Sequence, residues 1–315
     1  MSQPSNAPPP SVKPSERPQP PAFTKREQLF IQAQRLAPQQ LLSMAMYHIA
    51  RSRWRPLKKL LIEQVIRRYQ VDMSSAAEPD PSAYPSFNDF FTRALRPDAR
   101  PLPSEPGALC SPADGRISQF GAIHDGQIIQ AKGHSYSVEE LLGGESSWSK
   151  LFQKGQFINI YLSPQDYHRI HMPRSGILHR TVQIPGKLFS VNPLTTRAVP
   201  NLFARNERLC SLFESDVGPM AVVLVGAIFV SSMETVWGGE YLRSKQIITT
   251  DFGPPTLSVE LQRGEEMGRF NMGSTVILLF PPHTLHWAEK LKRGMHVKMG
   301  QRIAGVIHRE AGGRS

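Results

Sequence analysis

The sequence is poor in cysteine and has no metal-binding motif. Its 315 residues include only two cysteines, Cys110 and Cys210, which lie far apart and form no C-x-x-C pair. The ten histidines are scattered and include no H-E-x-x-H motif. The sequence therefore predicts neither a disulfide framework nor a metal site, and it favours a reducing compartment.

Long hydrophobic runs are also missing. Residues 1–21 contain eight prolines and no apolar core, which argues against a secretory signal and predicts a disordered leader over residues 1–23. The longest uncharged run, residues 217–233, is interrupted by Gly218, Pro219 and Gly226. It is shorter than the roughly 20 residues of a membrane-spanning helix. We expect one or two buried strands there.

Acidic residues are in short supply. The chain has 26 Asp and Glu against 37 Lys and Arg, a net charge of +11. Such a balance predicts an anionic partner, which the charge alone leaves open between nucleic acid, a membrane surface and an acidic metabolite. The 40% hydrophobic content predicts a packed globule.

Residues 24–72 form a helical segment in which Pro38 and Pro56 are the expected breaks. In residues 54–69 apolar side chains recur every four positions, and residues 51–70 carry seven basic side chains against one acidic side chain, Glu63. A basic amphipathic helix with a nearby Trp54 is typical of a membrane interface. The alternative is a surface helix packed on its own domain. Nucleic acid is disfavoured because no recognisable binding module accompanies the charge.

Residues 73–315 are expected to form the catalytic domain, entered through a Pro-containing linker at 74–86. Short β-like segments separated by turn residues predict an α+β fold, with a strand-rich body of two sheets or a partly open barrel behind the N-terminal helices. Helices are expected at 138–142 and 200–207. The expected strands are 115–120, 127–132, 156–162, 176–184, 221–230, 246–250, 256–261, 275–280 and 303–307.

A turn, Gly273-Ser274-Thr275, directly precedes one of these strands. Residues 268–275 spell G-x-x-x-x-G-S-T, but Ser274 replaces the lysine of a phosphate-binding loop and a strand follows instead of a helix. Because Gly273 has no Cβ, the local backbone can bend and strain. Two interpretations remain: an ordinary turn, or a peptide bond that is itself a substrate.

Two other segments carry reactive side chains. Asp114 lies in the turn Ser-Pro-Ala-Asp-Gly before a strand. His168 and His171 follow a helix start signal, Ser163-Pro164, so a helix ending before Pro173 is expected to present both rings on one face. Each residue taken alone is equally compatible with a structural role.

Several separated motifs nevertheless resemble one family, the pyruvoyl-dependent phosphatidylserine decarboxylases of bacteria. The resemblance runs from about residue 87 to residue 306. The chain has Met272 where the family commonly has Leu, a swap of similar volume. The motifs are FNDFF (87–91), SPADG (111–115), AKGH (131–134), DYHRIHMP (166–173), LFSVN (188–192), NLFARNER (201–208), ETVW (234–237) and EMGRFNMGST (266–275).

The resemblance implies that Asp114, His171 and Ser274 form a charge relay for self-cleavage between Gly273 and Ser274. His171 would remove the Ser274 proton, Asp114 would hold the imidazole, and Oγ would attack the Gly273 carbonyl. The products would be a β chain of residues 1–273 and an α chain of residues 274–315 that begins with a pyruvoyl group made from Ser274.

The resemblance also implies how the mature enzyme acts. The amino group of phosphatidylserine would form a Schiff base with the pyruvoyl group, which replaces pyridoxal phosphate, and no metal is needed. Carbon dioxide would leave and phosphatidylethanolamine would be released. His168 is the candidate proton donor, although the roles of His168 and His171 can be exchanged.

A lipid substrate favours the membrane interpretation of residues 24–72 and predicts peripheral attachment to the cytoplasmic side of the cell membrane. The expected partners are phosphatidylserine, an anionic membrane surface and the chain's own α and β fragments as a heterodimer, with a dimer of heterodimers also allowed and no nucleic acid. Two rival hypotheses are a pyruvoyl enzyme for a soluble amino acid and a lipid-binding protein that never matures.

Overall fold

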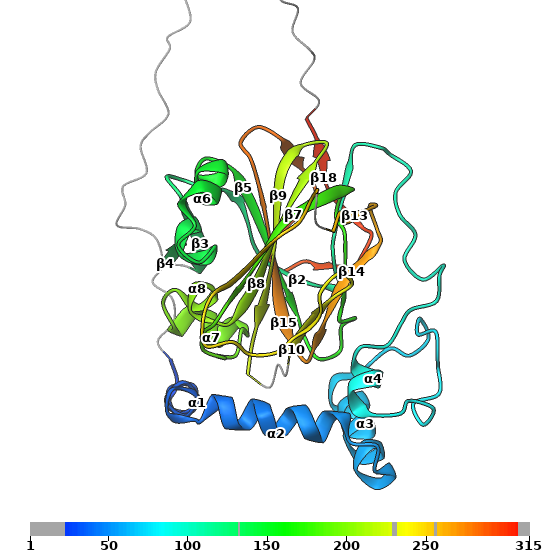
Figure 1. The fold of residues 1–315 in the computed structure, drawn as a ribbon. Helices are drawn as coiled ribbons and strands as arrows, with labels where there is room; N and C mark the ends of the chain where they lie inside the picture. Colours follow the sequence, from blue (N-terminus) through cyan, green and yellow to red (C-terminus); the bar gives the residue numbers. More distant parts are fainter. Residues whose placement is uncertain (1–22, 132, 229–231, 255–256, 308–315) are drawn as a thin grey trace, which may run out of the picture.

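A computed structural model describes residues 23–131, 133–228, 232–254 and 257–307. The expected leader lies outside these residues except for Phe23, as do parts of the strands expected at 127–132, 221–230 and 256–261. Three N-terminal helices lie along one end of a strand-rich body (Figure 1). The α+β prediction is confirmed, and the body contains several sheets, none of them closed.

The helices are short except for the first three. They are α1 (Lys25–Leu36), α2 (Gln39–Arg51), α3 (Arg55–Tyr69), α4 (Phe87–Phe91), α5 (Val138–Leu141), α6 (Ser146–Phe152), α7 (Pro193–Ala198) and α8 (Leu202–Arg205).

The strands pair antiparallel throughout the named sheets. They are β1 (Ala108–Cys110), β2 (Gly115–Ala122), β3 (Gln127–Ala131), β4 (His134–Ser137), β5 (Gln156–Leu162), β6 (Arg169–His171), β7 (Gly176–Ile184), β8 (Arg208–Ser215), β9 (Gly218–Gly226), β10 (Ser232–Thr235), β11 (Gly239–Tyr241), β12 (Ile248–Asp251), β13 (Glu260–Leu261), β14 (Glu266–Asn271), β15 (Ser274–Phe280), β16 (Leu285–Trp287), β17 (His296–Val297) and β18 (Arg302–Val306).

One large sheet is central to the body. Its order is β12-β7-β8-β9-β15-β5-β2-β17, with β13 also paired to β7. Smaller sheets have the orders β11-β10-β14-β6 and β1-β18-β16, and β3 and β4 form a hairpin. Strand β15 therefore lies in the middle of the large sheet.

Both faces of the large sheet are covered. Val276 and Leu278 of β15 point into a core shared with the two smaller sheets, whereas Ile277 and Leu279 point into a second core. The second core includes Trp148, Phe152 and Phe203 from the helices on the opposite face. Because alternate side chains face opposite ways along a strand, a strand covered on both sides must be apolar throughout. This explains the run from Val276 to Phe280.

Glutamine side chains fasten the first helices to the body. Gln34 of α1 donates to Thr195 Oγ1 at 3.1 Å and accepts from the Ser190 amide at 2.8 Å. Gln39 at the start of α2 accepts from the Leu188 amide at 2.8 Å. A third core, built on Ile62, Tyr84, Phe87, Phe90 and Phe91, joins α3 to α4.

Several boundaries differ from those expected. Pro56 does not break a helix, because it occupies the first turn of α3, where a missing amide proton is tolerated. The break falls at residues 52–54. The helix expected at 200–207 is reduced to Leu202–Arg205, and α7 precedes it.

The prediction of a helix after Ser163-Pro164 is wrong, because a turn and then a strand follow instead. The Ser163 amide and hydroxyl both donate to Asp166 Oδ2, each at 2.7 Å, which closes a turn. The chain then enters β6, which pairs with β14. His168 and His171 consequently do not share a helix face.

Candidate active site

Ser274 is the first residue of β15 and is completely buried. It is flanked by Gly226 of β9 and Leu162 of β5. Among the described residues its Oγ has no hydrogen-bond partner. A buried hydroxyl without a partner carries a desolvation cost.

Asp114 directly precedes β2, which lies two strands from Ser274 in the large sheet. Ser274 pairs with Leu162, and the β2–β5 register places Gly115 in the same row, two strands from Ser274. Neighbouring strands are about 4.8 Å apart, so these backbones are separated by roughly 10 Å. Gly115 permits this approach, because a Cβ there would lie 2.6 Å from the Tyr161 carbonyl oxygen.

The Asp114 carboxylate is held by a guanidinium. Arg100 Nε donates to Asp114 Oδ1 at 3.0 Å and its Nη2 to Oδ2, and the Met299 amide donates to Oδ1 at 2.7 Å. Both side chains are almost buried. Sequence reasoning missed Arg100, since a residue 14 positions upstream in an irregular segment gives no periodic signal.

His171 belongs to β6 and lies beside the Asp114 turn, with its amide donating to the Pro112 carbonyl at 2.8 Å. Its Nδ1 donates to the Gly264 carbonyl at 2.8 Å, so Nε2 accepts from the Tyr167 hydroxyl at 2.9 Å. Burial lowers the pKa of His171. Tyr167 is a second residue that sequence reasoning left without a role.

His168 is fully buried and stacks on Phe91 with ring centroids 4.0 Å apart. Its Nδ1 donates to the Asp166 carbonyl at 2.8 Å, whereas Nε2 has no partner among the described residues. Burial, followed by the charge of Arg93, lowers the pKa of His168 to about 3. His168 is therefore a neutral imidazole with a free acceptor nitrogen.

No hydrogen bond between described residues joins Asp114, His171, His168 and Ser274 into one chain. Asp114 is paired with Arg100, and both ring nitrogens of His171 are occupied. His168 is the histidine nearer to Ser274 along β14, because its carbonyl accepts from the Phe270 amide at 3.0 Å, whereas His171 pairs with Glu266.

The backbone before Ser274 is strained at Met272. This residue has φ of 94°, a region that side chains other than glycine seldom adopt. Gly273, where the sequence suggested the strain, is not among the residues with positive φ, and a Cβ added there would meet nothing within 4 Å. Strain therefore falls one residue earlier than expected.

A cavity of about 490 Å³ reaches this segment. Gly273 and Ser274 line it on the side of the body, and Phe30 and Ala33 of α1 line it on the other. The first helix thus forms part of the surroundings of Ser274. Within the described ranges, no group of three or more potential metal ligands is found.

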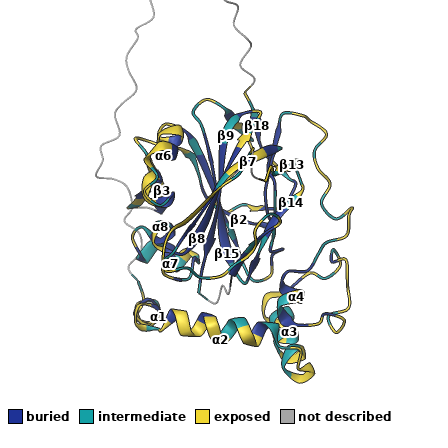
Figure 2. Cartoon of the chain, viewed as in Figure 1, coloured by how far each residue is buried: buried dark blue, intermediate teal, exposed yellow. Residues whose placement is uncertain are grey.

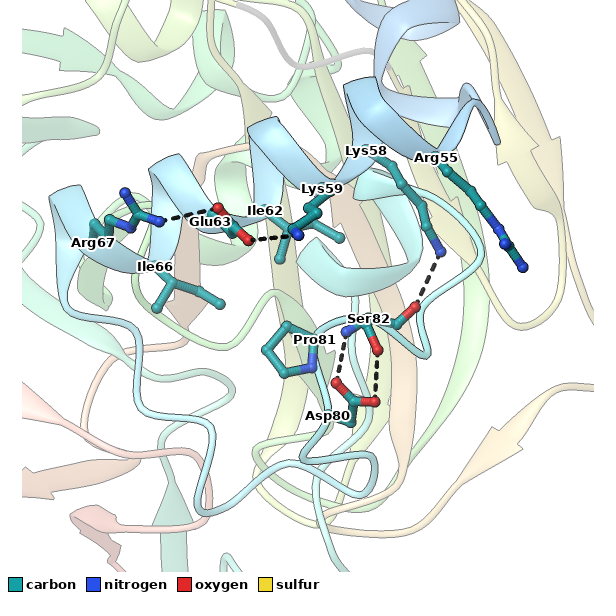
Figure 3. Close-up of a pocket in the computed structure, with 10 residues that line it drawn as sticks. All are labelled: Arg55, Lys58, Lys59, Ile62, Glu63, Ile66, Arg67, Asp80, Pro81 and Ser82. Atoms are coloured by element: carbon teal, nitrogen blue, oxygen red, sulfur yellow. Dashed lines mark hydrogen bonds and ion pairs between the residues drawn. The ribbon is translucent and has the colours of Figure 1, made fainter.

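Helix α3 borders a second, larger groove of about 600 Å³ (Figure 3). Lys58 Nζ donates to the Ser82 carbonyl at 3.1 Å, while Glu63 pairs with Lys59 at 3.8 Å and Arg67 at 3.0 Å. The five basic side chains of α3 therefore share one carboxylate of the helix, that of Glu63. No described helix is both long enough and apolar enough to cross a membrane.

Comparison with known proteins places the chain in a family. The model of the family described as phosphatidylserine decarboxylase matches residues 87–305, and a second model, described as PSD, matches residues 29–70. The chain is 53% identical to the phosphatidylserine decarboxylase proenzyme of Bordetella pertussis over 281 residues, covering 89% of this chain and 95% of that protein. It is 50% identical to the proenzyme of Pseudomonas putida over 285 residues, covering 90% and 99%. The chain therefore belongs to the phosphatidylserine decarboxylase family.

Proposed function

We propose that the chain cleaves itself between Gly273 and Ser274 and then converts phosphatidylserine to phosphatidylethanolamine and carbon dioxide. The observation that carries this proposal is the buried, unpartnered Oγ of Ser274 next to a strained backbone and a cavity. Relatives named as proenzymes support the self-cleavage step.

In the cleavage step, Ser274 Oγ attacks the Gly273 carbonyl carbon, and the peptide bond is exchanged for an ester as the Ser274 nitrogen leaves protonated. β-Elimination then breaks the Cβ–O bond, and Gly273 departs as a carboxylate. The dehydroalanine that remains takes up water and loses ammonia, which leaves a pyruvoyl group. Oxidation by an external reagent is not needed.

The base for Ser274 is assigned to His171, with Asp114 as the group that orients it. This assignment requires Asp114 to exchange Arg100 for His171, and His171 to release the Tyr167 hydroxyl. His168 needs less rearrangement to receive a proton, because its Nε2 already has no partner. His168 is assigned as the proton donor in decarboxylation.

The residues around Ser274 fit a covalent pyruvoyl group. Ser274 lines a cavity of about 490 Å³, and a Cβ added at Gly273 would meet nothing within 4 Å, so there is room for this group. Such a group supplies the electron sink for decarboxylation. The chain's own residues would enclose the headgroup within the Ser274 cavity, limit water there and hold His168 beside it.

Binding to the membrane surface is assigned to the N-terminal helices. Leu36, Leu41, Met44 and Trp54 are each at least 60% exposed, and α1 also lines the Ser274 cavity. Apolar side chains exposed on helices next to a cavity suit peripheral attachment, in which a headgroup passes from the bilayer into the site. The basic residues of α3 would favour an anionic membrane.

The self-cleavage claim predicts two fragments. Purified wild-type protein should separate on a denaturing gel into residues 1–273 and 274–315, whereas Ser274→Ala should remain a single 35.3 kDa chain. Intact mass spectrometry measures both, including the mass change at the new N-terminus. A wild-type protein that stays uncleaved would leave a lipid-binding protein as the better hypothesis.

The assignment of the two histidines predicts different defects. His171→Ala should abolish cleavage, whereas His168→Ala should cleave and lose decarboxylation by a factor of about 10² to 10⁴, the usual contribution of a general acid or base. Cleavage is followed by gel and carbon dioxide release by isotope counting. The reverse pattern would exchange the two roles.

Activity that persists with serine but is absent with phosphatidylserine would indicate a soluble substrate.

A further inference from the structure

A buried guanidinium near the candidate site lacks an anionic partner. Arg93, just after α4, is 4% exposed. Its Nη2 donates to the Gln165 carbonyl at 3.2 Å, and its guanidinium lies over the Phe90 ring at 5.5 Å. Among the described residues, its Nε and Nη1 are buried without a hydrogen-bond partner, and no carboxylate forms an ion pair with it. Buried charges are normally paired, so this site is incomplete.

Arg93 lies next to the residues assigned to the reaction. It bonds to Gln165, and the neighbouring Pro164 lines the Ser274 cavity. It packs on Phe90, while the His168 ring packs on Phe91. The positive charge of Arg93 also contributes, after burial, to the lowered pKa of His168. The unpaired guanidinium therefore faces the same loop, residues 163–168, as the cavity and the histidine.

The chemistry of the reaction selects the ligand. Phosphatidylserine carries two anionic groups, a carboxylate and a phosphodiester. The carboxylate loses its charge as carbon dioxide forms, so a cation fixed on it would stabilise the substrate more than the transition state. The phosphodiester keeps its charge throughout. A planar guanidinium can also donate two parallel hydrogen bonds to a phosphate.

We propose that Arg93 binds the phosphodiester of the lipid headgroup in the mature enzyme. The proposal rests on the function proposed above and extends it to the recognition of the substrate. Arg93 acts as a binding residue, since the phosphate takes no part in bond breaking.

Self-cleavage acts on a segment that packs against the same core as Phe90, the neighbour of Arg93. In the intact chain Met272 packs against the third core, which contains Phe87, Phe90 and Phe91, and its backbone is held at φ of 94°. Cleavage turns Gly273 into a chain end and releases residues 272–273 from β15. The strained backbone can then relax next to the core that contains Phe90, the ring on which Arg93 packs.

The test compares Arg93→Gln and Arg93→Lys with Arg96→Gln as the matched control. Arg96 is three residues away and its side chain is 56% exposed. Each protein is checked for self-cleavage by intact mass. KM and kcat are then measured with short-chain phosphatidylserine, and inhibition constants with glycerophosphoethanolamine, glycerophosphoserine and ethanolamine.

For Arg93→Gln we expect normal cleavage, a kcat within about threefold of wild type, and a KM about 10- to 100-fold higher, the range for loss of a charge-assisted hydrogen bond. The inhibition constants of both glycerophosphodiesters should rise in parallel, and that of ethanolamine should not change. Arg93→Lys should recover part of the loss because it keeps the charge, and Arg96→Gln should resemble wild type.

Three results would overturn the proposal. An unchanged KM would do so, as would weaker binding of glycerophosphoserine with unchanged binding of glycerophosphoethanolamine, which would assign Arg93 to the carboxylate. Loss of cleavage in both Arg93 variants but not in Arg96→Gln would assign it to folding. A wild-type protein that neither cleaves nor acts on phosphatidylserine would instead refute the function proposed above.

Discussion

At the scale of single residues, the site is marked by polar atoms that the fold buries without satisfying. Ser274 Oγ, His168 Nε2 and two nitrogens of Arg93 share this property. Each such atom costs roughly 1–3 kcal/mol relative to a satisfied one. Such atoms are not confined to the site, since Tyr136, Ser211 and Trp287 also bury a polar atom without a partner among the described residues.

The buried state of His168 predicts acid sensitivity. Its folded pKa of about 3 lies below the ordinary value of 6.5, so the unfolded chain takes up the proton first. As pH falls through 6.5 toward 3, His168 should reduce the free energy of unfolding by up to about 1.4 kcal/mol per pH unit. The effect is absent above pH 6.5, where both states are neutral.

Urea denaturation between pH 7.5 and 5 measures this effect. The Ser274→Ala background keeps the chain intact. His168→Gln in that background should lose part of the acid sensitivity, whereas the exposed His179→Gln should retain it. If the free energy of unfolding changed with pH in the same way for all three proteins, burial of His168 would not be coupled to stability.

At the scale of the elements, α1 and α2 each have one side bound to the body and another side exposed to solvent. One side is fastened to the body by Gln34 and Gln39. Figure 2 shows α2 largely exposed on the side away from the sheets. Periodicity in the sequence predicts helices here, but only the packing shows that apolar residues are left uncovered, since an amphipathic pattern is equally consistent with a fully packed face.

This exposed surface predicts a membrane-binding defect in a double variant. Leu41 and Met44 lie three residues apart on α2 and are 62% and 60% exposed. Leu41→Gln with Met44→Gln should weaken binding to phosphatidylcholine vesicles containing phosphatidylserine by about tenfold or more, because two apolar side chains no longer enter the bilayer. Binding should also weaken as salt rises.

Vesicle sedimentation measures this binding, and the double change Ile129→Gln with Ile177→Gln serves as the control. Those side chains are 49% and 43% exposed on the body, outside α1–α3. Equal binding by the two double variants would refute the assignment of the membrane contact to α2.

At the scale of the whole molecule, the proposed cleavage cuts the chain inside its central sheet. The fragment beginning at Ser274 would supply β15, which pairs along its length with β5 and with β9. It also supplies β17, which pairs with β2, and β18, which pairs with β1. The two fragments would therefore share one hydrophobic core.

We predict that the cleaved fragments remain together. Size-exclusion chromatography of cleaved protein in native buffer should give one peak that contains both chains, and only denaturant should separate them. The reason is that release of β15 would expose the buried residues Val276 to Phe280 and break two strand ladders. A free fragment of residues 274–315 in native buffer would contradict this.

The sequence by itself determined the N-terminal helices, the strand-rich body, the buried character of Val276–Phe280 and the candidates Asp114, His168, His171 and Ser274. Local patterns predict the helices, strands and turn, because periodicity and turn chemistry act over a few residues. The roles of the four candidate residues rest on the resemblance of longer motifs to the family. It misjudged residues 163–173, where pairing of β6 with β14 overrides a local helix signal. Only the tertiary structure decided that Arg100 donates hydrogen bonds to Asp114 and that the Tyr167 hydroxyl bonds to His171 Nε2. It alone also decided that the Arg93 guanidinium is buried without an anionic partner among the described residues. These facts depend on contacts between segments far apart in the chain, and on a balance between burial and pairing that no local pattern encodes.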